Sequence, residues 1–417
     1  MKVFKFGGAS VKDAQSIKNV HHIIGQYLGD PLIIVVSAMG KTTNNLEALL
    51  NAHMANQPTQ ELLEVIRLEH AKIVEELFGP KAKSALDDIN NTLVEVEWAL
   101  DDPEGLDKHF QYDQIVSIGE MLSTKIVSAY LKYVGIQNSW VDARDLIRTD
   151  NTYQNANVDW EETKKLTEST LKRAFSNQSV VVTQGFIGGT SENFTTTLGR
   201  EGSDFTAAIL AHCTNATDVT IWKDVPGVLN ADPKYFSDTV LISEMSYFDA
   251  MELAYFGTSV IHPKTIKPLQ NANIPLYVKS FIEPKAKGTI VADGSKPVTV
   301  PNYIVKKNQA LVSISPKDHS FVAENHFIEI FSTLHELRIK SNTMQNSAIS
   351  FSFSFDFDES KIILLKEKLT GFDLFYNEGC ELITVRHFDE ETIEKLVGQR
   401  DILLEQRNRT SAQLVVK

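Results

Sequence analysis

The stretch Lys5-Phe6-Gly7-Gly8-Ala9-Ser10-Val11 joins a strand pattern to a helix pattern. The apolar residues at 3–6 predict a buried strand, and the apolar spacing over 17–24 predicts an amphipathic helix. A strand, a glycine turn and a helix N-terminus together favour anions, because backbone N–H groups point outward and the helix dipole attracts negative charge. Lys5 adds a positive charge just before the turn. The stretch therefore predicts an α/β fold with a nucleotide phosphate site, although many α/β proteins use such a turn only as a connection.

The composition of the 417-residue chain narrows its class. The formal net charge is -13 and the basic residues are scattered, which argues against nucleic acid or an anionic membrane as a partner. The cysteines, Cys213 and Cys380, lack the spacing of a metal site. No targeting segment precedes the first strand, and no apolar run is long enough to span a membrane. The sequence therefore predicts a cytoplasmic protein with reduced, packed thiols.

Short β-branched runs alternate with helical patterns through residues 1–295. The expected strands lie at 31–36, 179–183, 218–222 and 275–278. The expected helices lie at 44–77, 86–100, 119–133 and 160–175. Continuous apolar strands are typical of a parallel sheet that helices cover on both faces. The sequence thus predicts a three-layer α/β/α sandwich as the catalytic domain, residues 1–295.

The pattern changes near residue 295, where Gly294, Pro297 and Pro301 mark a linker. After it, strands are shorter and alternate more strictly. Strands are expected at 310–315, 348–355 and 381–385, and helices at 321–337, 360–369 and 390–398. We interpret residues 296–417 as a small α+β regulatory region of two β-α-β units, the second of which could be incomplete.

Polar residues follow several of the expected strands. Ser37 ends the strand at 31–36, Thr43 opens a helical stretch, and Glu120 lies in the first turn of the helix at 119–133. Each has a plain structural explanation, such as a strand exit or a favourable partner for the helix dipole. Their shared position nevertheless suits a phosphoryl-transfer site.

The segment 195–204, TTTLGREGSD, is the most specific of these stretches. It is a polar loop, broken by glycines, that leads into an apolar helix. Ser203 or Asp204 could simply be the N-cap of that helix. Arg200, however, offers a planar fork for a carboxylate or a phosphate. Asp204 could hold Lys5 in place or bind a substrate ammonium, so we favour a functional role for this loop.

A turn-rich loop follows the strand at 218–222. Asp224, Asp232 and Lys234 lie on it, where a nucleotide base and ribose could bind, although solvated charges on an ordinary turn explain them equally well. His262 lies in the segment 256–264, FGTSVIHPK, and we interpret it as structural rather than catalytic.

Taken together, these segments resemble the aspartate kinases of the amino-acid kinase superfamily, which carry C-terminal ACT domains. The motifs occur in the same order: KFGGASV, VVSAMGKTTNNL, SIGEMLS, TQGFIG, TTTLGREGSD, IWKDVPGVLNADPK and FGTSVIHPKT. The resemblance implies transfer of phosphate from MgATP to the side-chain carboxylate of L-aspartate, which gives 4-phospho-L-aspartate on the way to lysine, threonine and methionine. A carboxylate is already ionised at neutral pH, so the reaction needs no general base. The Mg²⁺ would be carried by ATP, since no dense carboxylate cluster is visible.

The resemblance also implies roles for single residues. Lys5 would neutralise the transferring phosphoryl group, and Asp204 would organise Lys5. Arg200 would bind the α-carboxylate of aspartate, and Glu120 its ammonium. The sites would be completed by Gly7, Gly8, Ser37, Lys223, Asp224, Asp232 and Lys234 for the nucleotide and by Thr43 and Ser203 for the substrate.

Some positions depart from the family pattern. Ala9 replaces a threonine, Glu201 stands where glycine is common, and Leu229 stands where tyrosine is common. Ser259 takes the place of a lysine that contacts the nucleotide in many members. None of these changes removes a residue that the chemistry requires.

The stretch 339–350, IKSNTMQNSAIS, resembles the ACT segment that binds an inhibitory amino acid. Its polar residues could contact lysine or threonine as an effector: Asn342, Gln345, Asn346 and Ser347. Ala348 stands where a glutamate often occurs, and Ser320 replaces a glycine, so the effector stays open. Paired ACT units also imply a homodimer or a higher homo-oligomer.

Two other functions are compatible with the motifs. One is a different amino-acid kinase, acting on glutamate or N-acetylglutamate, but the pairing of Arg200 with Glu120 favours a free amino acid. The other is a non-catalytic amino-acid sensor that retains the fold. The retention of Lys5, Arg200 and Asp204 argues against that function.

Overall fold

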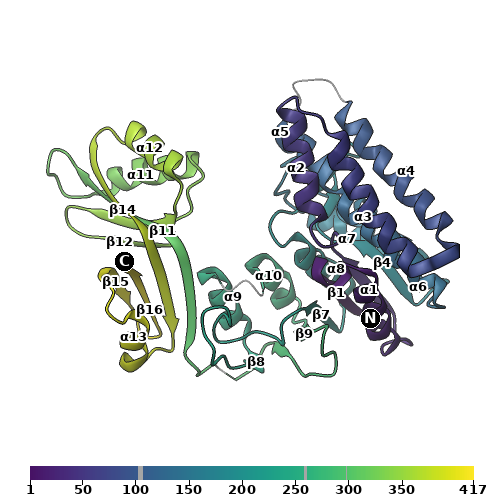
Figure 1. The fold of residues 1–417 in the computed structure, drawn as a ribbon. Helices are drawn as coiled ribbons and strands as arrows, with labels where there is room; N and C mark the ends of the chain where they lie inside the picture. The colour runs from purple at the N-terminus through teal and green to yellow at the C-terminus, as the bar shows by residue number, and fades with distance from the viewer. Residues whose placement is uncertain (102–106, 258–260, 297) are drawn as a thin grey trace. The chain divides into compact units, whose positions relative to one another are not determined.

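The structure, a computed structural model, describes residues 1–101, 107–257, 261–296 and 298–417 (Figure 1). The chain divides into two compact units. The first is formed mainly by Met1–Val228 and the second mainly by Thr299–Lys417, to which the loop Leu229–Val240 also belongs.

A mainly parallel sheet with the strand order β3-β4-β2-β1-β7-β9-β10-β8 forms the centre of the first unit. Its strands are β1 (Lys2–Phe6), β2 (Leu32–Val36), β3 (Ser139–Val141), β4 (Val180–Gln184), β7 (Asp218–Lys223), β8 (Glu244–Met245), β9 (Leu276–Ser280) and β10 (Thr289–Val291). Every residue of β2 and β4 is buried, as their continuous apolar sequences require. Only β10 runs antiparallel to a neighbour, β9, within the described part of this sheet.

Helices cover both faces of this sheet. They are α1 (Ala14–Gly25), α2 (Thr42–Met54), α3 (Gln60–Phe78), α4 (Lys83–Leu100), α5 (Lys108–Val116), α6 (Ile118–Tyr133), α7 (Trp160–Ala174), α8 (Gly202–Thr214), α9 (Tyr247–Phe256) and α10 (Pro263–Asn271). Phe4 and Phe6 pack into one apolar core with residues of α1, α3 and α6. Lys5 alternates to the opposite face, where α8 packs. The predicted α/β/α sandwich is confirmed.

The order of the strands places a crevice beside β1. This strand pairs in parallel with β2 on one side and with β7 on the other. In open α/β sheets, ligands bind in a crevice at the carboxyl ends of the strands. The crevice forms where the connections from two neighbouring strands lead to opposite sides of the sheet. Lys5 lies near that end of β1, Ser37 directly follows β2, and Lys223 ends β7.

Several short elements were not predicted. The strands β5 (Ile187–Gly189) and β6 (Thr195–Thr197) form an antiparallel hairpin outside the main sheet. β3, β8 and β10 were also missed, because two or three residues carry no usable periodicity. β10 lies just before the predicted linker and adds a strand to the first unit.

The second unit is built on an antiparallel sheet with the order β12-β13-β11-β14-β16-β15. Its elements are β11 (Asn302–Pro316), α11 (Glu324–Glu336), β12 (Thr343–Asn346), β13 (Phe351–Asp356), α12 (Glu359–Lys368), β14 (Phe372–Arg386), α13 (Glu390–Val397), β15 (Ile402–Arg407) and β16 (Ser411–Val416). The long strands β11 and β14 run through both halves of the sheet. One apolar core lies under α11 and α12 and another under α13, so the two halves share strands and do not simply follow each other along the chain.

Two sequence expectations concern thiols and membranes. Cys213 and Cys380 are free and buried, as packed thiols should be. None of the helices in the described ranges combines the length and the apolar character that crossing a bilayer requires.

Candidate active site

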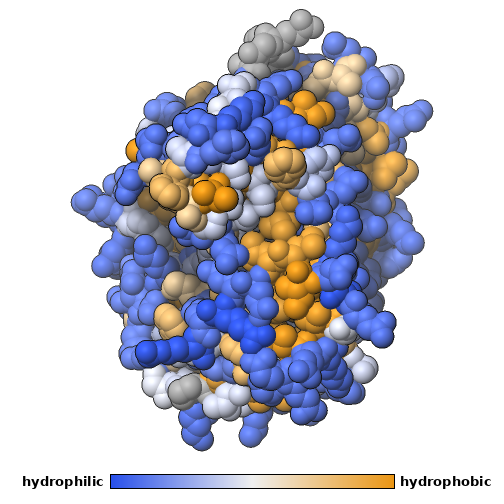
Figure 2. Space-filling view, turned by 90° about the vertical axis from the view of Figure 1, so that its left-hand side faces the viewer, coloured by the Kyte–Doolittle hydropathy of each residue, from blue (hydrophilic) through white to orange (hydrophobic). Residues whose placement is uncertain are grey.

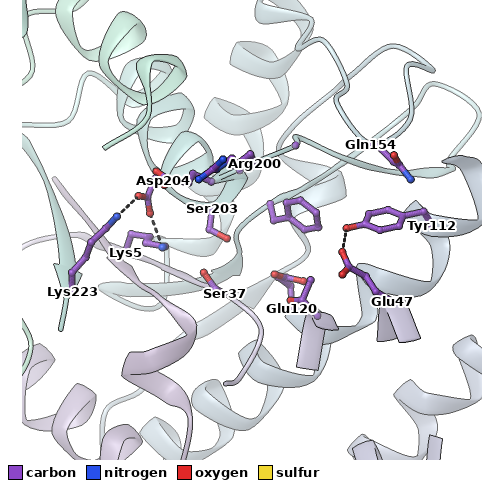
Figure 3. Close-up of a pocket in the computed structure, with 15 residues that line it drawn as sticks. Lys5, Ser37, Glu47, Tyr112, Glu120, Gln154, Arg200, Ser203, Asp204 and Lys223 are labelled. Atoms are coloured by element: carbon purple, nitrogen blue, oxygen red, sulfur yellow. Dashed lines mark hydrogen bonds and ion pairs between the residues drawn. The ribbon is translucent and has the colours of Figure 1, made fainter. Parts of the chain in front are cut away.

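A cavity of about 660 Å³ lies at the carboxyl ends of β1, β2 and β7 in the first unit (Figure 3). It brings together most of the predicted site residues: Lys5, Ser37, Thr43, Glu120, Arg200, Ser203, Asp204 and Lys223. It is also lined by Glu47, Tyr112, Gln154, Phe186, Gly199, Glu201 and Gly202.

The centre of the cavity holds two lysines on one carboxylate. Lys5 Nζ lies 2.6 Å from Asp204 Oδ1, and Lys223 Nζ lies 3.2 Å from Asp204 Oδ2. The Asp204 side chain is only 1% exposed. Burial by itself would raise the pKa of Asp204, but the charges of Lys5 and Lys223 outweigh it and hold the pKa below its ordinary value. The carboxylate is therefore ionised and fixes both lysines toward the cavity (Figure 3).

Three helices begin at this cavity. Thr43 lies in the first turn of α2, Glu120 in that of α6, and Ser203 in that of α8. The unpaired N–H groups and the positive dipole ends of these helices add to the charge of the lysines. The arrangement suits a group that carries several negative charges, such as a chain of phosphates.

The glycine turn after β1 packs against the turn after β2. Ser37 N donates to Phe6 O at 3.1 Å, and Gly40 N donates to Gly8 O at 3.1 Å. A Cβ atom at Gly8 would lie 2.8 Å from Ala38 O, so only glycine fits there. Gly7 and Gly8 thus stand beside the cavity, although they do not line it directly.

Glu120 is a buried carboxyl group of the cavity with a strongly raised pKa. Its side chain is buried, and Oε1 accepts a hydrogen bond from Ala38 N at 3.1 Å. Oε2 is buried too and has no hydrogen-bond partner among the described residues. Burial raises the pKa of Glu120 to about 8. A cation bound in the cavity would supply the missing partner.

Arg200 lies on the loop between β6 and α8, next to Gly199, which adopts φ +78°. Its guanidinium is exposed and makes no ion pair within the described part of the chain. Arg200 and Glu120 reach the cavity from different elements (Figure 3). The cavity therefore presents a free cation and a buried carboxyl group to one ligand.

Glu201 follows Arg200 in the left-handed region, with φ +55° and ψ +28°. Glycine adopts this conformation without strain, which explains in physical terms why glycine is common at this position in the resembling family. Burial raises the pKa of Glu201, and Lys223 only partly offsets this effect. Glu201 thus places an acidic group beside the two lysines.

Replacing Glu201 with glycine is expected to relieve the backbone strain and to remove this acid. We expect the free energy of unfolding to rise by about 0.5–1 kcal/mol. The Kd for ATP, used as a polyphosphate probe, should fall by about threefold, because less negative charge opposes the phosphates. Urea titration and isothermal titration with ATP measure the two effects. Asn193→Gly is the matched control, since Asn193 also has a positive φ but lies outside the cavity. An unchanged Kd for ATP in Glu201→Gly would contradict this account.

Four residues of the cavity escaped prediction: Glu47, Tyr112, Gln154 and Phe186. Tyr112 Oη donates to Glu47 Oε1 at 2.6 Å and ties α5 to α2 (Figure 3). Gln154 and Phe186 both have positive φ, of 67° and 70°. No local sequence signal marks Glu47, Tyr112 or Gln154. Phe186 lies within the motif TQGFIG, but the motif alone does not identify it as a residue of the site.

Other predicted nucleotide residues do not line the cavity. Asp224 follows β7 directly and is exposed. Asp232 and Lys234 are exposed on the loop that belongs to the second unit, where Lys234 N donates to Asp232 Oδ1 at 2.9 Å. Ser259 lies outside the described residues. The nucleotide roles of these residues remain predictions.

His262 is the N-cap of α10, and its Nδ1 accepts from Lys264 N at 3.2 Å. This contact is structural, as we interpreted it. Among the residues proposed for an effector, Asn342 is held within the second unit: it accepts from Lys306 Nζ at 2.8 Å and donates to Gln309 Oε1 at 2.7 Å. Gln345, Asn346 and Ser347 are exposed at the edge strand β12 and the turn after it.

Comparisons with known proteins agree with this geometry. The model of the amino acid kinase family matches residues 1–280. Lysine-sensitive aspartokinase 3 of Escherichia coli is 31% identical over 84% of this chain and 76% of that protein. Chloroplastic aspartokinase 1 of Arabidopsis thaliana is 32% identical over 84% of this chain, which spans 62% of that plant protein's length.

The fold was compared with solved structures as well. The crystal structure of E. coli aspartokinase III in complex with aspartate and ADP has a TM-score of 0.83 and 27% identity, and the match covers 100% of this chain and 96% of that one. The same protein in complex with lysine and aspartate has a TM-score of 0.81. The chain belongs to the amino acid kinase family and, within it, to the aspartokinases.

Proposed function

We propose that this chain transfers the γ-phosphoryl group of ATP to the side-chain carboxylate of L-aspartate, giving 4-phospho-L-aspartate and ADP. The observation that carries the proposal is the Lys5–Asp204–Lys223 cluster in a cavity that also holds Arg200 and Glu120. The two lysines of the cluster suit the phosphates of a nucleotide, and the pair of Arg200 and Glu120 suits a free amino acid.

Substrate recognition rests on two groups of opposite character. Arg200 would form a paired hydrogen bond with the α-carboxylate. Glu120 would ionise to accept the α-ammonium at its unpartnered Oε2. An N-acylated amino acid has no ammonium, so it would leave this buried carboxyl group unsatisfied. The pair therefore favours a free amino acid over N-acetylglutamate.

The transfer itself needs little covalent chemistry from the protein. A carboxylate oxygen of aspartate attacks the γ-phosphorus, and the bond to the β,γ-bridging oxygen breaks, so that ADP carries away the electron pair. Lys5 and Lys223 would neutralise the charge on the phosphoryl oxygens, and the N-termini of α2 and α8 would add to this effect. Asp204 would keep both lysines in position.

A magnesium ion would accompany the nucleotide. Both oxygens of Asp204 already contact lysines, and the described residues contain no cluster of metal-ligating side chains that could hold the ion on its own. The phosphate oxygens and water would therefore hold the Mg²⁺, whose charge offsets that of the phosphates.

The test is ATP-dependent formation of an acyl phosphate, trapped with hydroxylamine, in the presence of L-aspartate, L-glutamate or N-acetyl-L-glutamate. Hydroxamate from aspartate only is the expected result. Product from glutamate or its acetyl derivative would assign the chain to another amino-acid kinase. ATP binding without any product would favour the sensor.

Replacing Arg200 with alanine is expected to damage the use of aspartate more than that of ATP. The KM for aspartate should rise about 30-fold, because a charged hydrogen-bonding partner of the α-carboxylate is lost. Initial rates with each substrate varied in turn measure the effect. Arg67→Ala serves as a control, because its guanidinium pairs with Glu64 and Glu97 outside the cavity. Unchanged saturation by aspartate in Arg200→Ala would assign Arg200 another role.

Residues 296–417 would form the regulatory region. Lysine or threonine is the proposed effector class, by analogy with the lysine-sensitive relative. Isothermal titration tests this, and an absence of heat with either amino acid, with or without substrates, would count against such control. A cytoplasmic location remains a prediction.

A homodimer or higher homo-oligomer would be formed through apolar surface. Large apolar side chains are exposed on the second unit at Phe321, Ile328, Ile349, Ile363 and Phe375. The face turned to the viewer in Figure 2 also carries an apolar area bordered by hydrophilic residues. Exposed apolar patches often mark protein contacts. Sedimentation velocity of the whole chain tests the proposal, and a monomer at micromolar concentration would contradict it.

A further inference from the structure

The outer edge of β6 is completed by side chains of a helix. β6 pairs with β5 along one edge. Along its other edge, Gln114 of α5 donates from Nε2 to Thr195 O at 2.8 Å, and its Oε1 accepts from Thr195 N at 3.2 Å. One residue earlier, Asp113 Oδ2 accepts from Thr197 N at 2.8 Å and Oδ1 accepts from Thr197 Oγ1 at 2.6 Å. Helix α5 therefore fixes the strand that leads into the Arg200 loop.

Asp113 holds a second segment of the cavity as well. Gln154 N donates to both carboxylate oxygens, at 3.2 and 3.0 Å. Close by, Ala156 N donates to Thr197 O at 2.9 Å, which joins the same loop to β6. One carboxylate thus connects the Gln154 loop to the residue that precedes Leu198 and Gly199.

The environment of Asp113 is unusual for a structural contact. Its side chain is 0% exposed, and it forms no ion pair with a described residue. Burial raises the pKa of Asp113 to about 6, although the donors Thr197 and Gln154 lower it. Burying an uncompensated carboxylate is unfavourable unless hydrogen bonds satisfy it. Burial of the Asp113 carboxylate therefore costs free energy, and its hydrogen bonds hold the Gln154 loop and the end of β6 in place.

Gln154, one of the two residues that Asp113 holds, has a strained backbone. Gln154 has φ +67° and lines the cavity, as do Phe186 and Glu201, which also have positive φ. Non-glycine residues keep such conformations only where the surroundings impose them, and they gather at ligand sites. The hydrogen bonds from Gln154 N to Asp113 hold the backbone of Gln154 in place. The Gln154 side chain lines the cavity (Figure 3).

We propose that Asp113 is a positioning residue for the amino-acid substrate, and that the Gln154 amide it holds in the cavity contacts bound aspartate. This inference rests on the proposed aspartate kinase activity. Asp113 acts at two places: it orients Gln154 through the backbone of that residue, and it anchors the end of β6, from which Arg200 reaches the substrate.

The test compares Asp113→Ala, Asp113→Asn and Gln154→Ala with the wild type. In Asp113→Ala all four hydrogen bonds are lost, and the KM for aspartate should rise about tenfold or more, with kcat and the KM for ATP changed less than about twofold. Asp113→Asn should recover part of the loss, since one oxygen still accepts from both backbone donors. Gln154→Ala should raise the KM for aspartate without affecting stability.

Asn138→Ala is the matched control for general loosening of the unit. Asn138 is buried and makes hydrogen bonds to Ser128 and Ile136, but it lies outside the cavity. It should lower the melting temperature and leave the KM for aspartate unchanged. Equal rises in the KM values for aspartate and ATP in Asp113→Ala, or an unchanged KM for aspartate in Gln154→Ala, would overturn the proposal.

The inference and the proposed function fail in different ways. If the wild type forms no aspartyl hydroxamate, the proposed function fails first. If the wild type is active and Asp113→Ala saturates with aspartate as the wild type does, only the inference fails. Calorimetric titration of each variant with aspartate gives the same comparison without turnover.

Discussion

Replacing Lys5 with alanine is expected to lower kcat by about 100-fold or more, which corresponds to a loss of roughly 3 kcal/mol in transition-state stabilisation. The Lys5 ammonium lies at the carboxyl end of β1, held at 2.6 Å from Asp204. Negative charge shifts onto the phosphoryl oxygens during transfer, so a fixed cation stabilises the transition state more than bound ATP. The KM values should change less than kcat, and stopped-time hydroxamate assays measure both.

The fold should survive this substitution, because Asp204 keeps Lys223 as a partner. Lys2→Ala is the matched control: Lys2 lies on the same strand, pairs with Asp218 at the opposite end of β1 and does not line the cavity. It should retain the wild-type kcat. Near-wild-type turnover in Lys5→Ala, with circular dichroism unchanged, would refute the role proposed for Lys5.

Replacing Glu120 with glutamine should stabilise the protein at high pH. The folded state raises the pKa of Glu120 from 4.5 to about 8, so it binds this proton more tightly than the unfolded state does. The resulting loss of wild-type stability begins as the pH rises above about 4.5 and is complete above about 8. At pH 9 the variant should be more stable than the wild type by about 5 kcal/mol, and at pH 4 the difference should vanish. Urea titrations across this range measure it.

The same substitution should impair the use of aspartate. A neutral amide cannot balance the α-ammonium, and the KM for aspartate should rise about 100-fold. Glu61→Gln is the control, because Glu61 is also a first-turn glutamate, of α3, but is exposed. It should change neither property. A variant that matches the wild type in stability at every pH would show that Glu120 is not a buried, strained carboxyl group.

Stability and function therefore oppose each other at Glu120. The helix dipole of α6 explains why a glutamate is tolerated there, and the sequence alone is compatible with this structural explanation as well as with a functional one. Only the packing of α6 against the turn after β2 buries Glu120 and leaves Oε2 without a partner. Carboxyl groups with shifted pKa values are common at functional sites. Burial of such a group lowers the stability of the fold, but it strengthens the attraction between the ionised carboxylate and a bound cation.

Local patterns were sufficient for the main elements. β2 and β4 are continuous, largely β-branched runs, and α6 and α7 show helical spacing of apolar residues. The local residue pattern therefore predicts the secondary structure of these segments. The hairpin β5–β6 was missed because three-residue strands depend on their partners. β6 in particular is completed by Asp113 and Gln114, and no local pattern marks a helix that supplies the edge of a strand.

Local sequence patterns are enough to predict an α/β fold, a glycine turn for phosphate, and charged residues after several strands. These predictions follow from periodicity and turn chemistry among residues close together in the chain. Which charged groups contact one another depends instead on the tertiary structure. The tertiary structure joins Lys5, Asp204 and Lys223 from β1, α8 and β7, and it places Gln154 both on Asp113 and at the cavity. Ion pairs, burial and backbone strain depend on distances between segments that lie far apart in the sequence. Those distances are fixed only when the strands pair in the order of the parallel sheet.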